Sequence, residues 1–310
     1  MKKIKVIVAN LVLVFFCGPV SADVVFDGRF NEGNFSRYAA VEANGKAINA
    51  ALTPFGIPGH LERMVDPAGS GKVVMRATRW FGDVSTSGGF RSEVSAPKDP
   101  MGSERWYSWS YFLPDSLRSV KNEIVIAQIQ SLVDVGESNL RYPTLSLVVQ
   151  DDRIKLSNSF DYDRITSPLG TSPKPGIDFE RRELASWTLD TEKWTSLDLH
   201  VKWAADNTGF LEFWKDGVLL FQEANHINTF NDELGVWFKT GTYVFPTQST
   251  WPSVTTYSSG VKIGDGGETF QSMSMSVVPE PSIYLMMMVG LFGVGLRVYG
   301  RVGRQDRLGI

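Results

Sequence analysis

Three short stretches of the chain carry polar side chains at alternate positions, the spacing that puts side chains on one face of a β-strand. A strand face of this composition is unfavourable to bury unless it lines a wet groove or its groups pair with one another. If the face lines a groove, its Arg and Lys side chains could bind an anionic ligand, and a glycine in the strand leaves room for that ligand above the sheet. The alternating residues are Arg91 with Glu93, Gln128 with Gln130, and Lys239 with Gly241 and Tyr243.

The elements that must position these groups are predicted to be strands. Aromatic and β-branched segments recur between turn signals, and residues 215–218 read as an Asp-Gly hairpin turn. Long helical patterns are absent, apart from one helical turn expected near residues 180–185. We therefore predict an all-β fold, an antiparallel β-sandwich or jelly roll of the concanavalin-like kind. The clearest predicted strands are 72–78, 105–112, 123–130, 144–149, 196–203, 209–214 and 235–244.

Two stretches rich in Pro and Gly, residues 53–70 and 165–181, are predicted to be long loops. Loops of this length on a sandwich often line the binding cleft. His60 lies in the first of them and is either an exposed polar residue or a site residue.

In their order along the chain, these stretches resemble the motifs of jelly-roll polysaccharide lyases, above all the glucuronan lyase and heparin lyase I-like group. In alginate lyases the corresponding motifs read Arg-(Ser/Thr)-Glu-(Leu/Val), Gln-(Ile/Val)-His and Tyr-Phe-Lys-x-Gly-x-Tyr. The resemblance covers about residues 70–270, and the ordered set is specific although each motif alone is weak. The matching segments are 91–94, the Trp-Tyr-x-Trp-Ser strand and Leu-Pro-Asp of 106–115, 127–130, 200–217, 238–243 and the Ile-Gly-Asp-Gly of 263–266.

The resemblance implies β-elimination on a uronic-acid polymer. In that reaction a base removes the weakly acidic C5 proton and an acid protonates the departing glycosidic oxygen. Tyr243 is expected to do both, with its pKa lowered by Lys239 and Arg91. Gln128 and Arg91 would neutralise the substrate carboxylate, and Glu93 would orient Arg91.

One position departs from the lyase pattern. Where the lyases carry histidine after Gln-x, this chain has Gln130, which cannot transfer a proton. A syn elimination by Tyr243 alone survives this change, and His60 is the candidate replacement for the imidazole. The runner-up hypothesis is a non-catalytic carbohydrate-binding sandwich of the extracellular matrix, and a third is a structural matrix protein with the fold alone.

The other candidate residues have weaker support. Glu93, Gln130, Trp237 and Asn228 are predicted to contact substrate, Asn228 because it lies in a probable turn with His226. His200 alternates with apolar residues, so we interpret it as a structural histidine with satisfied hydrogen bonds.

No metal or cofactor is predicted. Calcium is conceivable at Asp265 or at the Asp151-Asp152 pair, but neither has the ligand density of a calcium site. A turn is the simpler explanation for both.

Both ends of the chain are predicted to be targeting segments that are not part of the folded domain. Residues 1–22 read as a signal peptide, with three lysines, a short apolar stretch and a small-residue cleavage site before Asp23. The only cysteine, Cys17, falls inside it, so the mature domain, residues 23–277, must be stable without disulfides.

Residues 278–310 combine Pro-Glu-Pro, an apolar run and arginines, and closely resemble the PEP-CTERM sorting signal of Gram-negative bacteria that make extracellular polysaccharide. The resemblance implies export and sorting machinery as partners, transient anchoring by a transmembrane helix in the tail, and a cell-surface, outer-membrane-associated or extracellular location. An ordinary membrane anchor is the alternative.

The charge of the mature domain excludes one class of partner. The three N-terminal lysines and the net two positive charges of the tail account for five charges, so the whole-chain value of −3 becomes about −8. Such a surface does not attract nucleic acid. The expected ligand is an anionic polysaccharide, and we expect a monomer.

Overall fold

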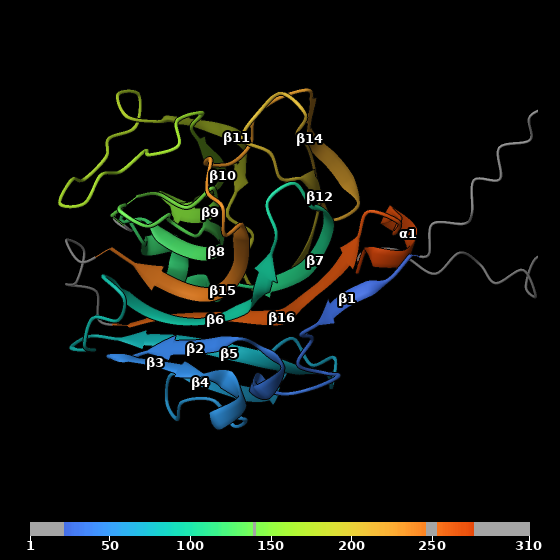
Figure 1. Cartoon of the computed structure of the whole chain (residues 1–310). Coiled ribbons are helices and arrows are strands. Elements are labelled where there is room, and N and C mark those ends of the chain that lie inside the picture. The colour runs from blue at the N-terminus through green and yellow to red at the C-terminus, as the bar shows by residue number, and fades with distance from the viewer. Residues whose placement is uncertain (1–21, 139–140, 246–252, 276–310) are drawn as a thin grey trace, which may run out of the picture.

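The computed structural model describes residues 22–138, 141–245 and 253–275. Among them, two antiparallel sheets of eight strands each pack face to face (Figure 1). Residues 1–21 of the predicted signal peptide, the C-terminal tail and its apolar run 283–296 lie outside the described residues. Within them, no helix is long and apolar enough to cross a membrane.

The chain crosses repeatedly between the two sheets, as in a jelly roll. The first sheet contains, in spatial order, β14 (Val218–Ala224), β13 (Phe210–Lys215), β12 (Trp194–Lys202), β7 (Glu104–Phe112), β16 (Ser253–Asp265), β5 (Val73–Trp80) and β4 (Leu61–Val65), with β1 (Val24–Asp27) paired to β16. The second contains β11 (Glu180–Thr188), β10 (Arg153–Phe160), β9 (Leu145–Gln150), β8 (Ile124–Ser131), β15 (Val236–Val244), β6 (Phe90–Asp99), β2 (Ala40–Ala43) and β3 (Lys46–Asn49). The short helices are η1 (Phe35–Arg37), η2 (Ala50–Leu52), η3 (Asp115–Ser119) and α1 (Phe270–Met273).

The core lies between the sheets and is built from alternate residues of each strand. Phe238 of β15 contacts Trp109 and Tyr107 of β7, with ring centroids 5.1 Å and 6.1 Å apart. Complete burial of side chains of this size stabilises the fold by about 1.5–3 kcal/mol each. Residues 237, 239, 241 and 243 therefore point away from this core, to the outer face of the second sheet.

Most of the predicted elements are confirmed. All seven predicted strands are present, and the 215–218 hairpin turn has positive φ at Asp216 (49°) and Gly217 (81°), as a type I′ turn requires. The helical turn predicted near 180–185 is wrong, because this segment is part of β11 and pairs with β10. The long loop predicted at 53–70 is interrupted by β4.

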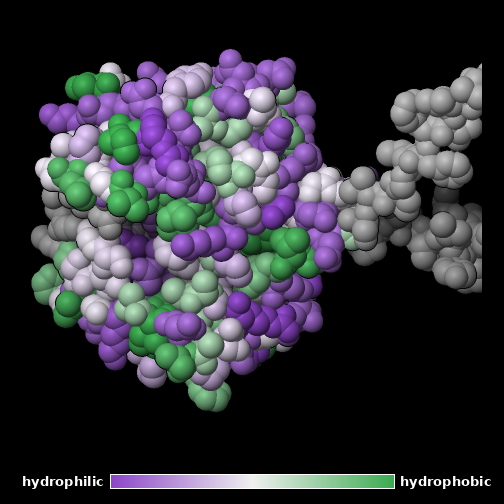
Figure 2. All heavy atoms as spheres, in the orientation of Figure 1, coloured by the Kyte–Doolittle hydropathy of each residue, from purple (hydrophilic) through white to green (hydrophobic). Residues whose placement is uncertain are grey.

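The surface shows no large apolar area on the face drawn in Figure 2. Hydrophilic side chains predominate there, and the hydrophobic ones are scattered among them. Isolated exposed apolar residues are normal on a soluble domain and carry no functional meaning by themselves.

Candidate active site

Three adjacent strands bring the predicted polar residues together. β15 lies between β6 and β8, and its Tyr243 is opposite Arg91 while its Lys239 is opposite Gln128. Gly241 is opposite Glu93. Because residues directly opposite each other in a sheet share a face, these side chains form one cluster on the outer face of the second sheet.

A carboxylate from a fourth strand joins this cluster. Glu42 of β2 is opposite Glu93 and forms a salt bridge with Lys239. Arg91 Nη1 lies 3.3 Å from Glu93 Oε2 and 3.9 Å from Glu42 Oε2. Gln128 donates its Nε2 hydrogen to Glu93 Oε1 at 2.7 Å. Each buried cation thus has a carboxylate partner, without which its burial would be strongly unfavourable.

The two carboxylates of the cluster differ in their affinity for a proton. Glu93 is completely buried, and this burial raises the pKa of its carboxyl in spite of Arg91 and Lys239. Burial also acts on Glu42, but Lys239 and Arg91 outweigh it and hold the pKa of Glu42 below its usual value. Glu42 therefore keeps its negative charge to lower pH than an ordinary glutamate, and Glu93 takes up a proton more readily.

Tyr243 lies under the guanidinium of Arg91, whose central carbon is 4.5 Å from the ring centroid. The phenol is only 9% exposed and packs against Val125 and Val148. Burial raises the pKa of Tyr243, and the opposing effect of Arg91 is smaller. The prediction of a lowered pKa is therefore wrong: it counted the neighbouring cations but not the loss of solvent.

The glycine between Lys239 and Tyr243 is needed for strand packing. Gly241 has a φ of +143°, and a Cβ atom there would come within 2.1 Å of the carbonyl oxygen of Ser92. The room above this glycine, which the sequence suggested for a ligand, is occupied by the backbone of β6.

Gln130 and Trp237 border the cluster. They are opposite each other on β8 and β15, and both are partly exposed. Lys239 Nζ lies 4.7 Å from the centroid of the Trp237 ring. Gln130 therefore stands beside the cluster, at the position where the lyase pattern has histidine.

Two further predicted site residues, His60 and Asn228, have hydrogen-bond partners outside the cluster. His60 precedes β4 of the first sheet, where its Nε2 is 2.9 Å from Asp83 Oδ1. Asn228 is buried, and its amide is fully used by the backbone: it accepts from the Ala204 N–H at 3.0 Å and donates to the carbonyls of Lys202 and Phe210. The structure thus gives Asn228 a structural position and pairs the His60 imidazole with Asp83.

The other histidines also have partners. His200 Nε2 and Nδ1 lie 3.0 Å and 2.9 Å from carboxylate oxygens of Glu104 and Glu212, and the imidazole stacks on Trp106. It is a satisfied structural histidine on the outer face of the first sheet. His226 packs edge-on against Phe160.

Acidic groups gather at one further place among the described residues. Asp134, Glu137 and Asp232 offer oxygens that all lie within 4.8 Å of one another. However, Arg141 pairs with both Glu137 and Asp232 and supplies the positive charge that a metal ion would bring. Asp265, a weak calcium candidate, accepts from the backbone N–H of Gly267 at 2.9 Å, as in an ordinary turn.

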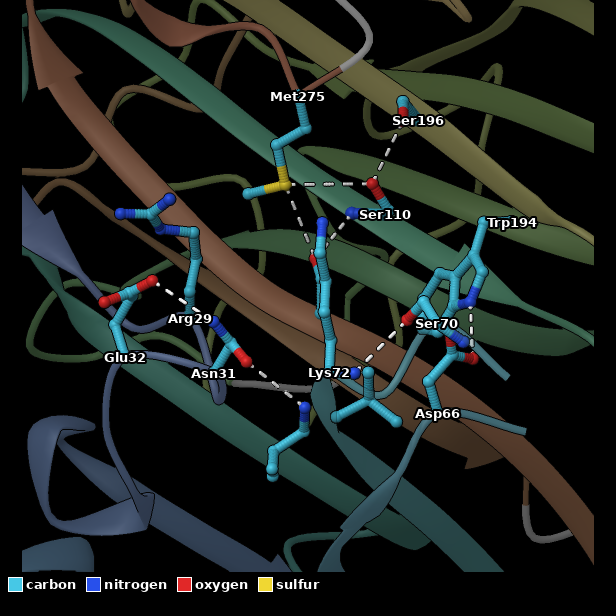
Figure 3. Close-up of a pocket in the computed structure, with 13 residues that line it drawn as sticks. Arg29, Asn31, Glu32, Asp66, Ser70, Lys72, Ser110, Trp194, Ser196 and Met275 are labelled. Carbon is cyan, nitrogen blue, oxygen red and sulfur yellow. Dashed lines mark hydrogen bonds between the residues drawn. The ribbon is translucent and has the colours of Figure 1, made fainter. Parts of the chain in front are cut away.

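A cavity of about 450 Å³ opens on the first sheet, away from this cluster. Figure 3 shows Lys72, Trp194 and Met275 around it, with the Trp194 indole donating to Asp66 Oδ1 at 2.7 Å. A second cavity, of about 300 Å³, lies on the same face as Tyr243 and includes Val148 in its wall. Val148 links this second cavity to the candidate site, because it packs against Tyr243.

The chain matches two known family models. Residues 30–262 match the family model described as polysaccharide lyase. Residues 277–301 match the PEP-CTERM protein-sorting motif, which points to export and a cell-surface or extracellular location. No curated protein matches the chain.

Similar solved structures include an endo-β-1,4-glucuronan lyase from the fungus Trichoderma reesei, with TM-score 0.60, 19% identity, and coverage of 80% of this chain and 97% of that one. A family 7 alginate lyase, A1-II′, bound to substrate has TM-score 0.51, 15% identity, and coverage of 78% and 99%. The catalytic domain of a glycoside hydrolase family 131 protein from Coprinopsis cinerea has TM-score 0.50, 15% identity, and coverage of 82% and 99%. At these identities the likeness concerns the fold, which both lyases and a hydrolase-family protein use.

Proposed function

The chain belongs to the polysaccharide lyase family, and we propose that it cleaves a uronate-containing polysaccharide by β-elimination, with Tyr243 as the proton-transfer residue. The main support is the cluster in which Arg91 covers the Tyr243 ring at 4.5 Å beside Gln128 and Lys239. This combination exceeds what simple sugar binding requires.

In the proposed reaction Tyr243 is both base and acid. Its phenolate takes the C5 proton, the C5–H electron pair forms the C4–C5 double bond, and the C4–O glycosidic bond breaks. The departing oxygen receives the proton from the same phenol, so that Tyr243 is regenerated. Because burial raises the pKa of Tyr243, the phenolate is scarce at neutral pH and the rate should rise with pH.

Arg91 and Gln128 have the groups to stabilise the intermediate. Removal of the C5 proton places negative charge on the sugar carboxylate, and fixed donors near that charge lower the barrier. Arg91 Nε is buried without a hydrogen-bond partner in the described structure, so one donor of the guanidinium is not used by the protein. Glu93 and Glu42 hold the guanidinium in place.

The second candidate function is carbohydrate binding without cleavage. It is favoured by Gln130, which cannot transfer a proton, and by the raised pKa of Tyr243, which keeps the phenol protonated. On either hypothesis we propose that the tail directs the protein to the cell surface, where it meets an anionic polysaccharide.

The test is an ultraviolet assay for the unsaturated sugar that β-elimination creates. The purified chain is incubated with polyglucuronate, alginate and a heparin-type polymer across a range of pH. A rise in absorbance with one of them, faster at alkaline pH, is the expected result. Measurable binding with no absorbance change on any polymer would overturn the lyase proposal in favour of the binding function.

A further inference from the structure

The cations of the candidate active site are already neutralised by the protein. Lys239 pairs with Glu42, and Arg91 lies within 4 Å of both Glu42 and Glu93. These two cations and two carboxylates leave little net charge to attract a polymer that carries a carboxylate on successive sugars. Attraction for the rest of such a chain must come from another part of the same face.

A continuous row of side chains leads from Tyr243 across the second sheet. Tyr243 is opposite Val125, Val125 is opposite Val148, and Val148 is opposite Lys155. The first three pack together as one apolar cluster. Lys155 is thus three strands from Tyr243, or about 14 Å at the usual strand spacing. An oligosaccharide, but not a single sugar, would reach from one to the other.

The row ends in the 300 Å³ cavity, which lies between the sheet and the loop that precedes β11. Its floor includes Val148 and Lys155, and Pro175 belongs to the loop. The remaining lining residues are Glu123, Ser157, Arg181, Arg182 and Glu183.

Two cations of this cavity have no carboxylate within 4.0 Å among the described residues. Lys155 Nζ donates to the neutral side chain of Gln150 at 3.1 Å. The Arg181 guanidinium stacks on the ring of Tyr142, 4.2 Å from its centroid, and its Nε has no hydrogen-bond partner in the described structure. The third cation, Arg182, differs because it is paired with Glu223. Lys155 and Arg181 therefore remain available to an external anion.

We propose that this cavity binds a second sugar of the same polysaccharide chain and recognises its carboxylate through Lys155 and Arg181. The inference rests on the proposed function, since it takes the anionic polymer from there, and it adds a requirement for charge at a distance from the bond that is cleaved. Neutral polysaccharides, and fragments too short to span Tyr243 and Lys155, would lose this contact.

Glu123 and Glu183 supply an internal control. Both line the cavity without forming a salt bridge to its cations. They repel a bound carboxylate, so neutralising either one should strengthen binding. If the cavity held only water, neither the loss of a positive charge nor the loss of a negative charge would change the affinity for the oligosaccharide.

The experiment measures the affinity of the Tyr243→Phe chain, which should bind without turnover, for a long glucuronate oligosaccharide and a disaccharide. Lys155→Met and Arg181→Gln are each expected to weaken binding of the long oligosaccharide about tenfold, the effect of one charged hydrogen bond. Glu183→Gln should tighten it about twofold. Lys72→Met, beside the other cavity, is the matched control and should change nothing. Binding of the disaccharide should be equal in all variants.

Several results would overturn the inference. They are equal affinity of Lys155→Met, Arg181→Gln and the Tyr243→Phe parent, an equal loss in Lys72→Met, or no binding of the anionic oligosaccharide by the parent. Circular dichroism confirms that each variant is folded. Because binding is measured without cleavage, failure of the lyase proposal leaves this test intact. Conversely, if the chain cleaves the polymer but its cavity variants bind as well as the parent, only the proposal about the cavity is refuted.

Discussion

The two ends of the second sheet's outer face treat charge in opposite ways. Around Tyr243, Lys239 and Arg91 are buried and held by carboxylates of the protein. Beyond Val148, Lys155 and Arg181 are partly exposed and have no carboxylate partner among the described residues. The same residue types thus have different roles at the two ends. A cation that is paired with a carboxylate is fixed in place, whereas an unpaired cation stays available to a ligand.

The paired cations position side chains of the candidate active site, whereas the unpaired cations attract an anionic polymer. A buried ion pair contributes little net stability, but removal of one partner leaves an uncompensated charge and is strongly destabilising. An exposed, unpaired cation contributes little to folding and can act on a polymer that approaches from solution. The same substitution of a lysine should therefore lower the free energy of unfolding much more at the Tyr243 end than at the Lys155 end.

The largest effect is expected from Lys239→Met, which leaves Glu42 buried beside Arg91 at 3.9 Å as its remaining cation. The free energy of unfolding should fall by about 3–5 kcal/mol. Urea denaturation measures it. A loss below about 1 kcal/mol, the value of a surface pair, would mean that the buried cluster is solvated and would remove the contrast between the two ends.

Glu42→Gln should have an effect that depends on pH. The folded-state pKa of Glu42 lies below the usual 4.5, so its contribution to stability is present above pH 4.5 and is lost as pH falls through the folded pKa. The difference in unfolding free energy between parent and variant should therefore be larger at pH 7 than at pH 3. Chemical denaturation at both pH values tests this, and a difference independent of pH would contradict the assigned charge of Glu42.

Gln130→His should raise the rate of cleavage. It places an imidazole, with a pKa near 6.5, beside Trp237 and close to Lys239. A base that is half deprotonated near neutral pH relieves the scarcity of the Tyr243 phenolate, so kcat at pH 7 should rise about tenfold or more. The pH profile should also begin to rise at lower pH. An unchanged rate and profile would show that Tyr243 works without a partner at this position.

Lys155→Met should give the smallest change in stability, less than about 0.5 kcal/mol, because no carboxylate is left unpaired. The same denaturation experiment compares it directly with Lys239→Met. A large loss would show that Lys155 is a structural cation like Lys239, and the two ends of the face would then be alike.

The sequence pattern could predict which residues share a face, but not how deeply they lie. Alternation predicted which residues share a face within each of β6, β8 and β15, since the side-chain period of a strand is local. The grouping of Arg91, Gln128, Lys239 and Tyr243 in one site came from the resemblance to the lyases. The raised pKa of Tyr243 depends on packing against Val125 and Val148, which come from strands far away in the sequence. Local pattern carries no information about that burial.

Contacts made by loops and short strands could also not be predicted from the sequence. Glu42 belongs to a strand of four residues, and only its position between Val41 and Ala43 hints that one carboxylate faces a sheet. β11 was mistaken for a helical turn because an edge strand carries polar residues on both faces. The placements of His60 and Asn228 follow from how their loops fold back, for which no periodic signal exists.

The central claim is that Tyr243 transfers the protons of β-elimination. The most direct measurement compares the rate of unsaturated-product formation by the parent chain and by Tyr243→Phe, at equal occupancy with polyglucuronate. Our account predicts that the variant loses cleavage by a factor of about 10² to 10⁴ while its affinity for the polymer stays nearly the same, because only the hydroxyl is removed. Cleavage by Tyr243→Phe at the parent's rate would contradict it.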